Sequence, residues 1–106
     1  MDSLEATTTE YLTATNGTTV QSISFTKKGN IVQMTGWNYV YGGAVTSDLT
    51  IGSTTFLPKQ TTPFFGKTLG GLNVFGYIGT TGYVVISGLS NTPSSSTYYF
   101  GCTYIC

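Results

Sequence analysis

The residues of this sequence best suited to chemistry are aromatic, amide and carboxylate side chains near its middle: Trp37, Asn38, Tyr39, Tyr41 and Asp48. A sugar-binding surface combines aromatic rings, on which the C–H faces of a sugar stack, with donors and acceptors that match its hydroxyls. This stretch has that mixture, and it predicts a saccharide-binding site. The alternative is that the rings belong to the core or to a subunit interface, where large aromatics of β-domains usually lie.

Catalytic chemistry is not expected from these residues. The sequence has no histidine to serve as a base near neutral pH, and Asp48 is its only carboxylate side chain after residue 10. A glycosidase needs two carboxylates that flank the bond, and only Glu5 or Glu10 could approach Asp48 in space. No hydrolase elbow is present, and the glycines at Gly79 and Gly82 lack the Lys-Ser/Thr of a phosphate loop. We therefore expect a binding protein and no enzyme.

The composition indicates a single all-β domain with a neutral surface. The chain of 106 residues is long enough for one domain with one modest core. Charged residues make up 8% of it, against about 25% in an average globular domain, and Thr, Ser, Gly and Tyr take their place. These are residues of strands and turns. Four lysines and a net charge of zero do not form the basic stripe that a nucleic-acid partner requires.

No segment predicts secretion, membrane insertion or a cofactor. The first residues, Met1–Glu5, lack the basic and apolar parts of a signal peptide, and no apolar run is long enough to cross a membrane. Cys102 and Cys106 would lie about 13 Å apart in an extended segment, beyond disulfide reach. Two cysteines are also too few for a zinc site. We expect free thiols, no metal, and synthesis in a reducing compartment such as a bacterial cytoplasm.

Alternating polarity predicts the strands that must position these side chains, and it is clearest in a hairpin over residues 18–37. The turn is expected at Lys27–Asn30, where Gly and Asn tolerate positive φ. In the second arm Trp37 falls on the face opposite Met34. The first arm alternates apolar residues with Ser and Thr in the same way.

The remaining segments predict about seven short strands in all and no helix. Further strands are expected over residues 44–51, 72–78, 83–88 and 97–105. Turn signals at about 8–12-residue spacing indicate a single antiparallel β-sandwich or barrel. Residues 1–17 are predicted to be a linker or neck with a possible short first strand at 11–14, and residues 18–106 to be the β-domain.

The segment 56–65 is expected to be an irregular crossover or an edge, because each of its two prolines removes a ladder donor. Its apolar residues are expected to anchor it to the core. They are Phe56, Leu57, Phe64 and Phe65.

The second hairpin, over residues 72–88, is apolar on both faces of its first arm. Val74 and Ile78 share one face, and Phe75 and Tyr77 share the other. Such strands are buried between sheets or between subunits. Burial of Phe75 and Tyr77 against a threefold neighbour would gain roughly 25 cal/mol per Å², which predicts a homotrimer.

The order of several short motifs resembles the head domain of phage tail receptor-binding proteins, which phages of Gram-positive bacteria carry on tail tips or baseplates. The motifs are GNIVQMTG at 29–36, Leu57-Pro58 before Pro63, and VFGYIGTTGYVVI at 74–86. They extend over most of the chain, about residues 18–105.

This resemblance implies a jelly-roll-like trimeric head that binds host cell-wall or cell-surface polysaccharide without hydrolysing it. It implies a location in the virion, with other tail or baseplate proteins contacting the N-terminal side. Some heads of the family bind sugar through a His, an Asp and a Trp near the second hairpin. Here that hairpin has Gly76, Tyr77 and Ile78, so the family site is not carried over. The alternatives are a structural baseplate or fibre module that contacts only virion proteins, and a small lectin-like adhesin.

Overall fold

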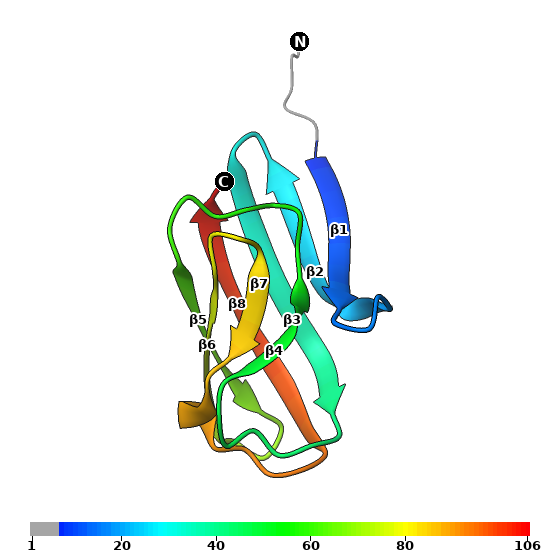
Figure 1. Cartoon of the computed structure of the whole chain (residues 1–106), viewed down its shortest axis with the longest axis vertical. Helices are drawn as coiled ribbons and strands as arrows, with labels where there is room; N and C mark the ends of the chain where they lie inside the picture. Colours follow the sequence, from blue (N-terminus) through cyan, green and yellow to red (C-terminus); the bar gives the residue numbers. More distant parts are fainter. Residues whose placement is uncertain (1–6) are drawn as a thin grey trace.

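The structure, a computed structural model that describes residues 7–106, is a closed antiparallel β-barrel (Figure 1). Its elements in chain order are β1 (Thr7–Ala14), β2 (Thr19–Lys28), β3 (Ile31–Tyr41), β4 (Leu49–Ser53), β5 (Thr62–Thr68), β6 (Asn73–Ile78), β7 (Tyr83–Ile86), the short 3-10 helix η1 (Gly88–Ser90) and β8 (Ser96–Ile105).

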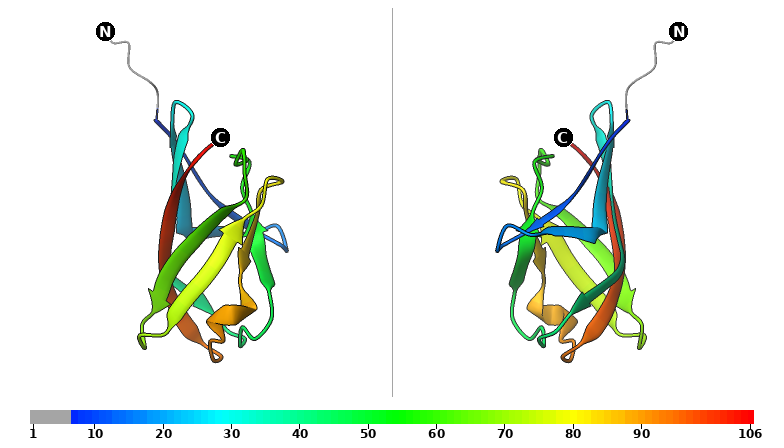
Figure 2. Two further views of the ribbon diagram at one scale, coloured as in Figure 1. Left: turned by 90° about the vertical axis from the view of Figure 1, so that its left-hand side faces the viewer. Right: turned by 90° about the vertical axis from the view of Figure 1, so that its right-hand side faces the viewer.

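Each strand has an antiparallel partner on both sides, in the closed order β1-β2-β3-β8-β5-β6-β7-β4 (Figure 2). The predicted all-β, antiparallel fold is confirmed, and the described part of the chain forms one barrel of eight strands, against the seven or so that were expected. The hairpin of residues 18–37 is present as β2 and β3, which pair up to Lys28 and Ile31 around a turn at Gly29 and Asn30. Its second arm continues to Tyr41.

Closure of the barrel depends on β1, which is longer than the short strand expected at 11–14. It pairs with β2 from Thr7, opposite Lys28, and with β4 at Thr13 and Ala14. Thr7–Thr9, expected to belong to a linker, are therefore part of the barrel wall. Residues 1–6 of the predicted neck lie outside the described residues.

The prolines disturb the 56–65 segment less than the sequence predicts. Pro63 is the second residue of β5 and pairs with Tyr77 of β6. Because β5 pairs with β8 only from Phe65 onward, Pro63 has a strand neighbour on one side only, where a missing N–H is tolerated. The irregular part ends at residue 61, so an irregular crossover up to residue 65 is not found, whereas the alternative of an edge fits Pro63, which is paired on one side only.

Side chains fill the interior of the barrel. The buried hydrophobic cluster consists of Leu12, Ile23, Phe25, Val32, Met34, Val45, Ile51, Phe64, Val74, Ile78, Val84, Ile86, Tyr98, Phe100 and Tyr104. Phe64 is fully buried as predicted, but Phe65 is 62% exposed and Leu57 is 48% exposed. The prediction that these two anchor the core is wrong. Phe65 faces outward because consecutive residues of a strand point to opposite faces, and Leu57 lies in the connection between β4 and β5, where no strand pairing turns it inward. With its interior packed, the barrel offers a ligand its outer surface and its ends.

Glycines make room for the largest rings. Phe64 and Phe100 stack with their centroids 4.8 Å apart, and the inward positions beside them on neighbouring strands are Gly36, Gly66 and Gly76. A Cβ at any of the three would overlap one of these rings or the backbone. Small residues opposite large ones are the usual filling of a narrow barrel.

Among residues 7–106 no helix is long and apolar enough to span a membrane. The same residues hold no group of three or more His, Cys, Asp or Glu side chains that could ligate a metal ion. Cys102 and Cys106 are both free and partly buried. Burial raises the pKa of Cys102 to about 11, so its thiol is a poor nucleophile at neutral pH.

Candidate functional site

The outer face of β3, β8, β5 and β6 carries four outward-facing aromatic rings that we call the aromatic face. Trp37, Phe65 and Phe75 are exposed, and Tyr99 is half-buried. They come from four adjacent strands of the barrel. Trp37 pairs with Tyr99, and Phe65 pairs with both Gly101 and Phe75. The strand alternation that buries Met34, Phe64, Val74 and Phe100 turns these four rings outward.

Trp37 and its neighbours form the part of this face that best fits a sugar. The indole is 68% exposed, and its ring meets Tyr99 edge-on with centroids 4.8 Å apart. The Tyr99 hydroxyl donates a hydrogen bond of 2.8 Å to Asn38 Oδ1. We call Trp37, Asn38 and Tyr99 the Trp37 cluster. It presents an aromatic ring next to an amide and a hydroxyl.

A bulge at Asn38 separates the residues that the sequence grouped together. Asn38 has φ 65, and the pairing of β3 with β8 shifts between Trp37 and Tyr39. The shift turns Tyr39 toward the core, where its ring lies 6.0 Å from Tyr98 and 6.4 Å from Phe100. Desolvation, with smaller contributions from Tyr41 and Tyr98, raises the pKa of Tyr39 to about 12. The Tyr39 hydroxyl therefore stays protonated at neutral pH and well above it.

Tyr41 and Asp48 also lie apart from the Trp37 cluster. Tyr41 is partly buried and packs against the core together with Tyr39. Asp48 lies in the β3–β4 connection, and its Oδ1 accepts a hydrogen bond of 2.9 Å from the backbone N–H of Gly88 in η1. Of the five candidate residues, the structure thus brings Trp37 and Asn38 together at the surface and gives Tyr39 and Tyr41 packing positions.

Tyr99 belongs to the Trp37 cluster but was not among the residues that the sequence predicted for the site. The signal was present in the alternation of that strand. Tyr98, Phe100 and Tyr104 are buried, and Tyr99, between the first two, must therefore face outward.

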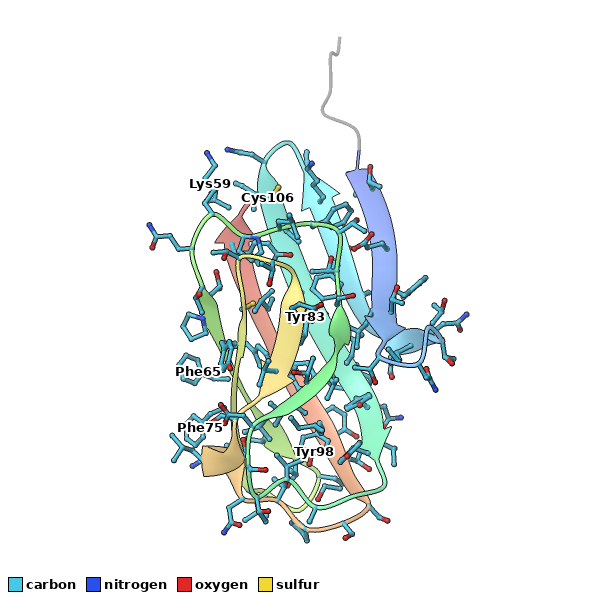
Figure 3. All side chains as sticks on the ribbon, viewed as in Figure 1. Lys59, Phe65, Phe75, Tyr83, Tyr98 and Cys106 are labelled. Carbon is cyan, nitrogen blue, oxygen red and sulfur yellow. The ribbon has the colours of Figure 1, made fainter. Side chains whose placement is uncertain are left out.

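Phe65 and Phe75 form a second aromatic pair on the same face. They lie directly opposite each other on β5 and β6, with ring centroids 6.1 Å apart and planes at 89°. Phe65 is 62% exposed and Phe75 is 37% exposed. In Figure 3 the two side chains lie together outside the barrel, whereas the fully buried Tyr98 lies within its outline.

Two shallow hollows at the ends of the barrel fit a sugar less well. One, of about 400 Å³, is lined by Lys59, Gln60 and Tyr104 among others. The other, of about 570 Å³, lies between the β5–β6 turn and the β7–β8 loop and is lined by Ser and Thr with Leu69 and Leu72. Neither lining combines an exposed aromatic ring with the amide of an Asn.

Glu10 is the carboxylate with the most hydrogen bonds among the described residues, and its role is structural. It accepts hydrogen bonds from Thr54 Oγ1, from the backbone N–H of Thr55 at 2.7 Å and from Thr55 Oγ1 at 2.6 Å. Desolvation raises the pKa of Glu10, but the hydrogen bonds from Thr54 and Thr55 outweigh it, and the net pKa is lowered. Glu10 thus fastens the β4–β5 connection to β1.

We expect Glu10→Gln to destabilise the barrel by about 1 kcal/mol at pH 7, because the hydrogen bonds to a charged acceptor are lost at a partly exposed site. A carboxyl group whose pKa is lowered on folding contributes stability above its unfolded pKa and loses it as the pH falls through the folded pKa. The urea midpoints of the unaltered protein and of Glu10→Gln, determined from pH 7 to pH 3, measure the difference in stability between them. It should shrink as the pH falls below the ordinary value of 4.5, and a constant difference would contradict the assignment.

In comparisons with known proteins, no family model, no curated protein and no solved structure matches this chain.

Proposed function

We propose that this chain is a non-catalytic head domain of a phage tail, which attaches to saccharide on the host cell surface through the Trp37 cluster. The observation that carries this proposal is the exposure of the Trp37 ring, 68% in a chain with one tryptophan. Tyr99 supports the indole edge-on and fixes the Asn38 amide next to it. An exposed ring beside hydrogen-bonding groups matches the two surfaces of a sugar.

The proposal includes a homotrimer at the tail tip or baseplate and a jelly-roll-like relationship of the strands. Tyr77 points outward from β6 as a trimer interface would require, and it is partly covered within the chain. Phe75, which the sequence also assigned to that interface, packs edge-on against Phe65 of its own chain instead. The N-terminal side remains the proposed contact with other tail proteins. Light scattering at micromolar concentration measures the mass directly, and a monomer would contradict the trimer.

The second candidate function is a structural baseplate or fibre module that contacts only virion proteins. The exposed Phe65 and Phe75 pair favours it, because rings of this kind are enriched at protein interfaces. In that case the aromatic face would bind protein and no saccharide.

The test is binding of the purified protein to Gram-positive cells and to a glycan array. We expect Trp37→Ala to weaken binding about 30-fold, the loss of about 2 kcal/mol typical of a hot-spot aromatic. Tyr83→Ala is the matched control: Tyr83 is 54% exposed on β7, four strands away around the ring of eight, and its loss should leave binding unchanged. Equal binding by both variants would reject the site, and no binding by the unaltered protein would reject the function.

A further inference from the structure

We infer that Phe65 is a second stacking position of the same site, so that its ligand is an extended neutral polysaccharide chain lying across β3, β8 and β5 rather than a single sugar. This inference rests on the proposed function and specifies its ligand class. It goes beyond the Trp37 cluster because it gives a binding role to a ring two strands away.

The spacing of the two rings requires a ligand longer than one sugar. Trp37 and Phe65 lie on strands separated by β8, a distance of about 10 Å across the sheet. Trp37 is level with Tyr99 and Phe65 is level with Gly101, two residues further along β8, which adds about 7 Å along the strands. The two positions are therefore about 12 Å apart. Stacked rings lie within about 4.5–7 Å of each other, so a single sugar ring reaches one position only.

The surface between the two rings is low and polar. Gly101 of β8 is paired with Thr35 on one side and Phe65 on the other. Because Gly101 has no side chain, a bound chain can approach the backbone of β8 between the two raised rings. The exposed Thr35 hydroxyl offers a donor and an acceptor at the same level. This arrangement matches a polymer whose sugars are stacked at two points and hydrogen-bonded between them.

Packing holds the Phe65 ring in place at the surface. Phe75 lies directly opposite on β6 and meets it edge-on. A ring that is already oriented loses little conformational freedom when a ligand binds. Phe75, being less exposed, acts as the support and Phe65 as the contact.

The charges of this wall favour a neutral ligand. The outward residues of β3, β8, β5 and β6 include one charged side chain, Lys67, level with Trp37 and Tyr99. A polyanion such as a phosphate-rich wall polymer would require several basic groups.

The size of the aromatic face favours a ligand chain over a second copy of the protein. The four rings extend over three strand spacings and two residues along the strands, roughly 14 by 7 Å, on the order of 100 Å². A standard protein interface buries about 800 Å² on each partner. A second copy would have to bury a much larger surface around the rings.

The experiment uses neutral polysaccharide extracted from Gram-positive cell walls, intact and hydrolysed to monosaccharide and longer oligosaccharide fractions. Binding is measured by calorimetry and by the fluorescence of Trp37, the only tryptophan in the chain. We expect Phe65→Ala to bind the intact polymer and the long fraction about tenfold more weakly than the unaltered protein. It should bind the monosaccharide fraction equally well. Tyr83→Ala should match the unaltered protein with every fraction.

Other outcomes separate this inference from the proposed function. If Phe65→Ala binds all fractions as the unaltered protein does while Trp37→Ala loses them, the second position is rejected and the function stands. If Phe65→Ala changes the oligomeric mass in light scattering, the ring belongs to an interface between copies and the inference is overturned. If the unaltered protein binds no fraction and the Trp37 fluorescence does not change, the proposed function itself fails.

Discussion

Gly76→Ala is expected to destabilise the barrel by about 3 kcal/mol, at the upper end of the range for overpacked cores. Gly76 is buried on β6 opposite Phe64. A Cβ at this position would overlap the Phe64 ring and the backbone carbonyl oxygen of Val85. The ring has no free space to move into, because Phe100 stacks against it at 4.8 Å. The strand would have to move away from the core.

Gly42→Ala is the matched control for this prediction. Gly42 follows β3 at the end of the barrel, and a Cβ there would meet no atom within 4 Å. Its replacement is expected to change stability by no more than about 0.5 kcal/mol. Urea unfolding followed by circular dichroism measures both variants. Equal urea midpoints for Gly76→Ala and Gly42→Ala would contradict the prediction, because they would show that the core can accommodate a Cβ next to the Phe64 ring.

Tyr98→Ala is expected to cost about 3–5 kcal/mol, as removal of a large buried aromatic does. Tyr98 is among the largest fully buried side chains, and its hydroxyl shares a hydrogen bond with Thr92 Oγ1, which is also buried. Thr92 in turn exchanges two backbone hydrogen bonds with Val45, of 2.9 and 3.0 Å. Tyr98 thus connects the β7–β8 loop and the β3–β4 connection to the core.

A double-mutant cycle separates the contribution of the Tyr98 hydroxyl to stability from that of its ring. We expect Tyr98→Phe to cost about 1–3 kcal/mol, because the Thr92 hydroxyl loses its buried partner. In a Thr92→Val background the same change should cost less stability, because the Thr92 hydroxyl is already absent and Tyr98→Phe leaves no buried hydroxyl without a partner. Tyr83→Phe, at an exposed position, serves as the control and should be near neutral. Identical costs in both backgrounds would show that the hydrogen bond contributes nothing.

These two predictions concern the scaffold, and the scaffold explains why the candidate site lies outside. Every strand contributes inward side chains to a filled interior. The same alternation places Trp37, Tyr99 and Phe65 on the outer surface. Recognition by this barrel would therefore depend on a rigid wall of paired strands.

Much of the local structure could be predicted from sequence because it depends on near neighbours. The hairpin of β2 and β3 follows from period-two polarity around Gly29-Asn30, and the outward position of Trp37 follows from the same pattern. The inward direction of Val74 and Ile78 does not follow from the pattern, since both faces of that strand are apolar. Alternation shows which residues share a face, but it does not show which face is buried when both are apolar.

The sequence by itself determined an all-β chain with few charges, a net charge of zero and an aromatic cluster near residue 37, because composition and alternation can be read from each segment alone. Only the tertiary structure decided which aromatics form a surface. The bulge at Asn38 breaks the alternation, so Tyr39 turns inward while Trp37 stays outside. Tyr99 and Phe65 join Trp37 because β8 pairs with both β3 and β5. The physical reason is that pairing between distant strands is fixed by closure of the whole barrel, including the contact of β1 with β4, and no short segment encodes it.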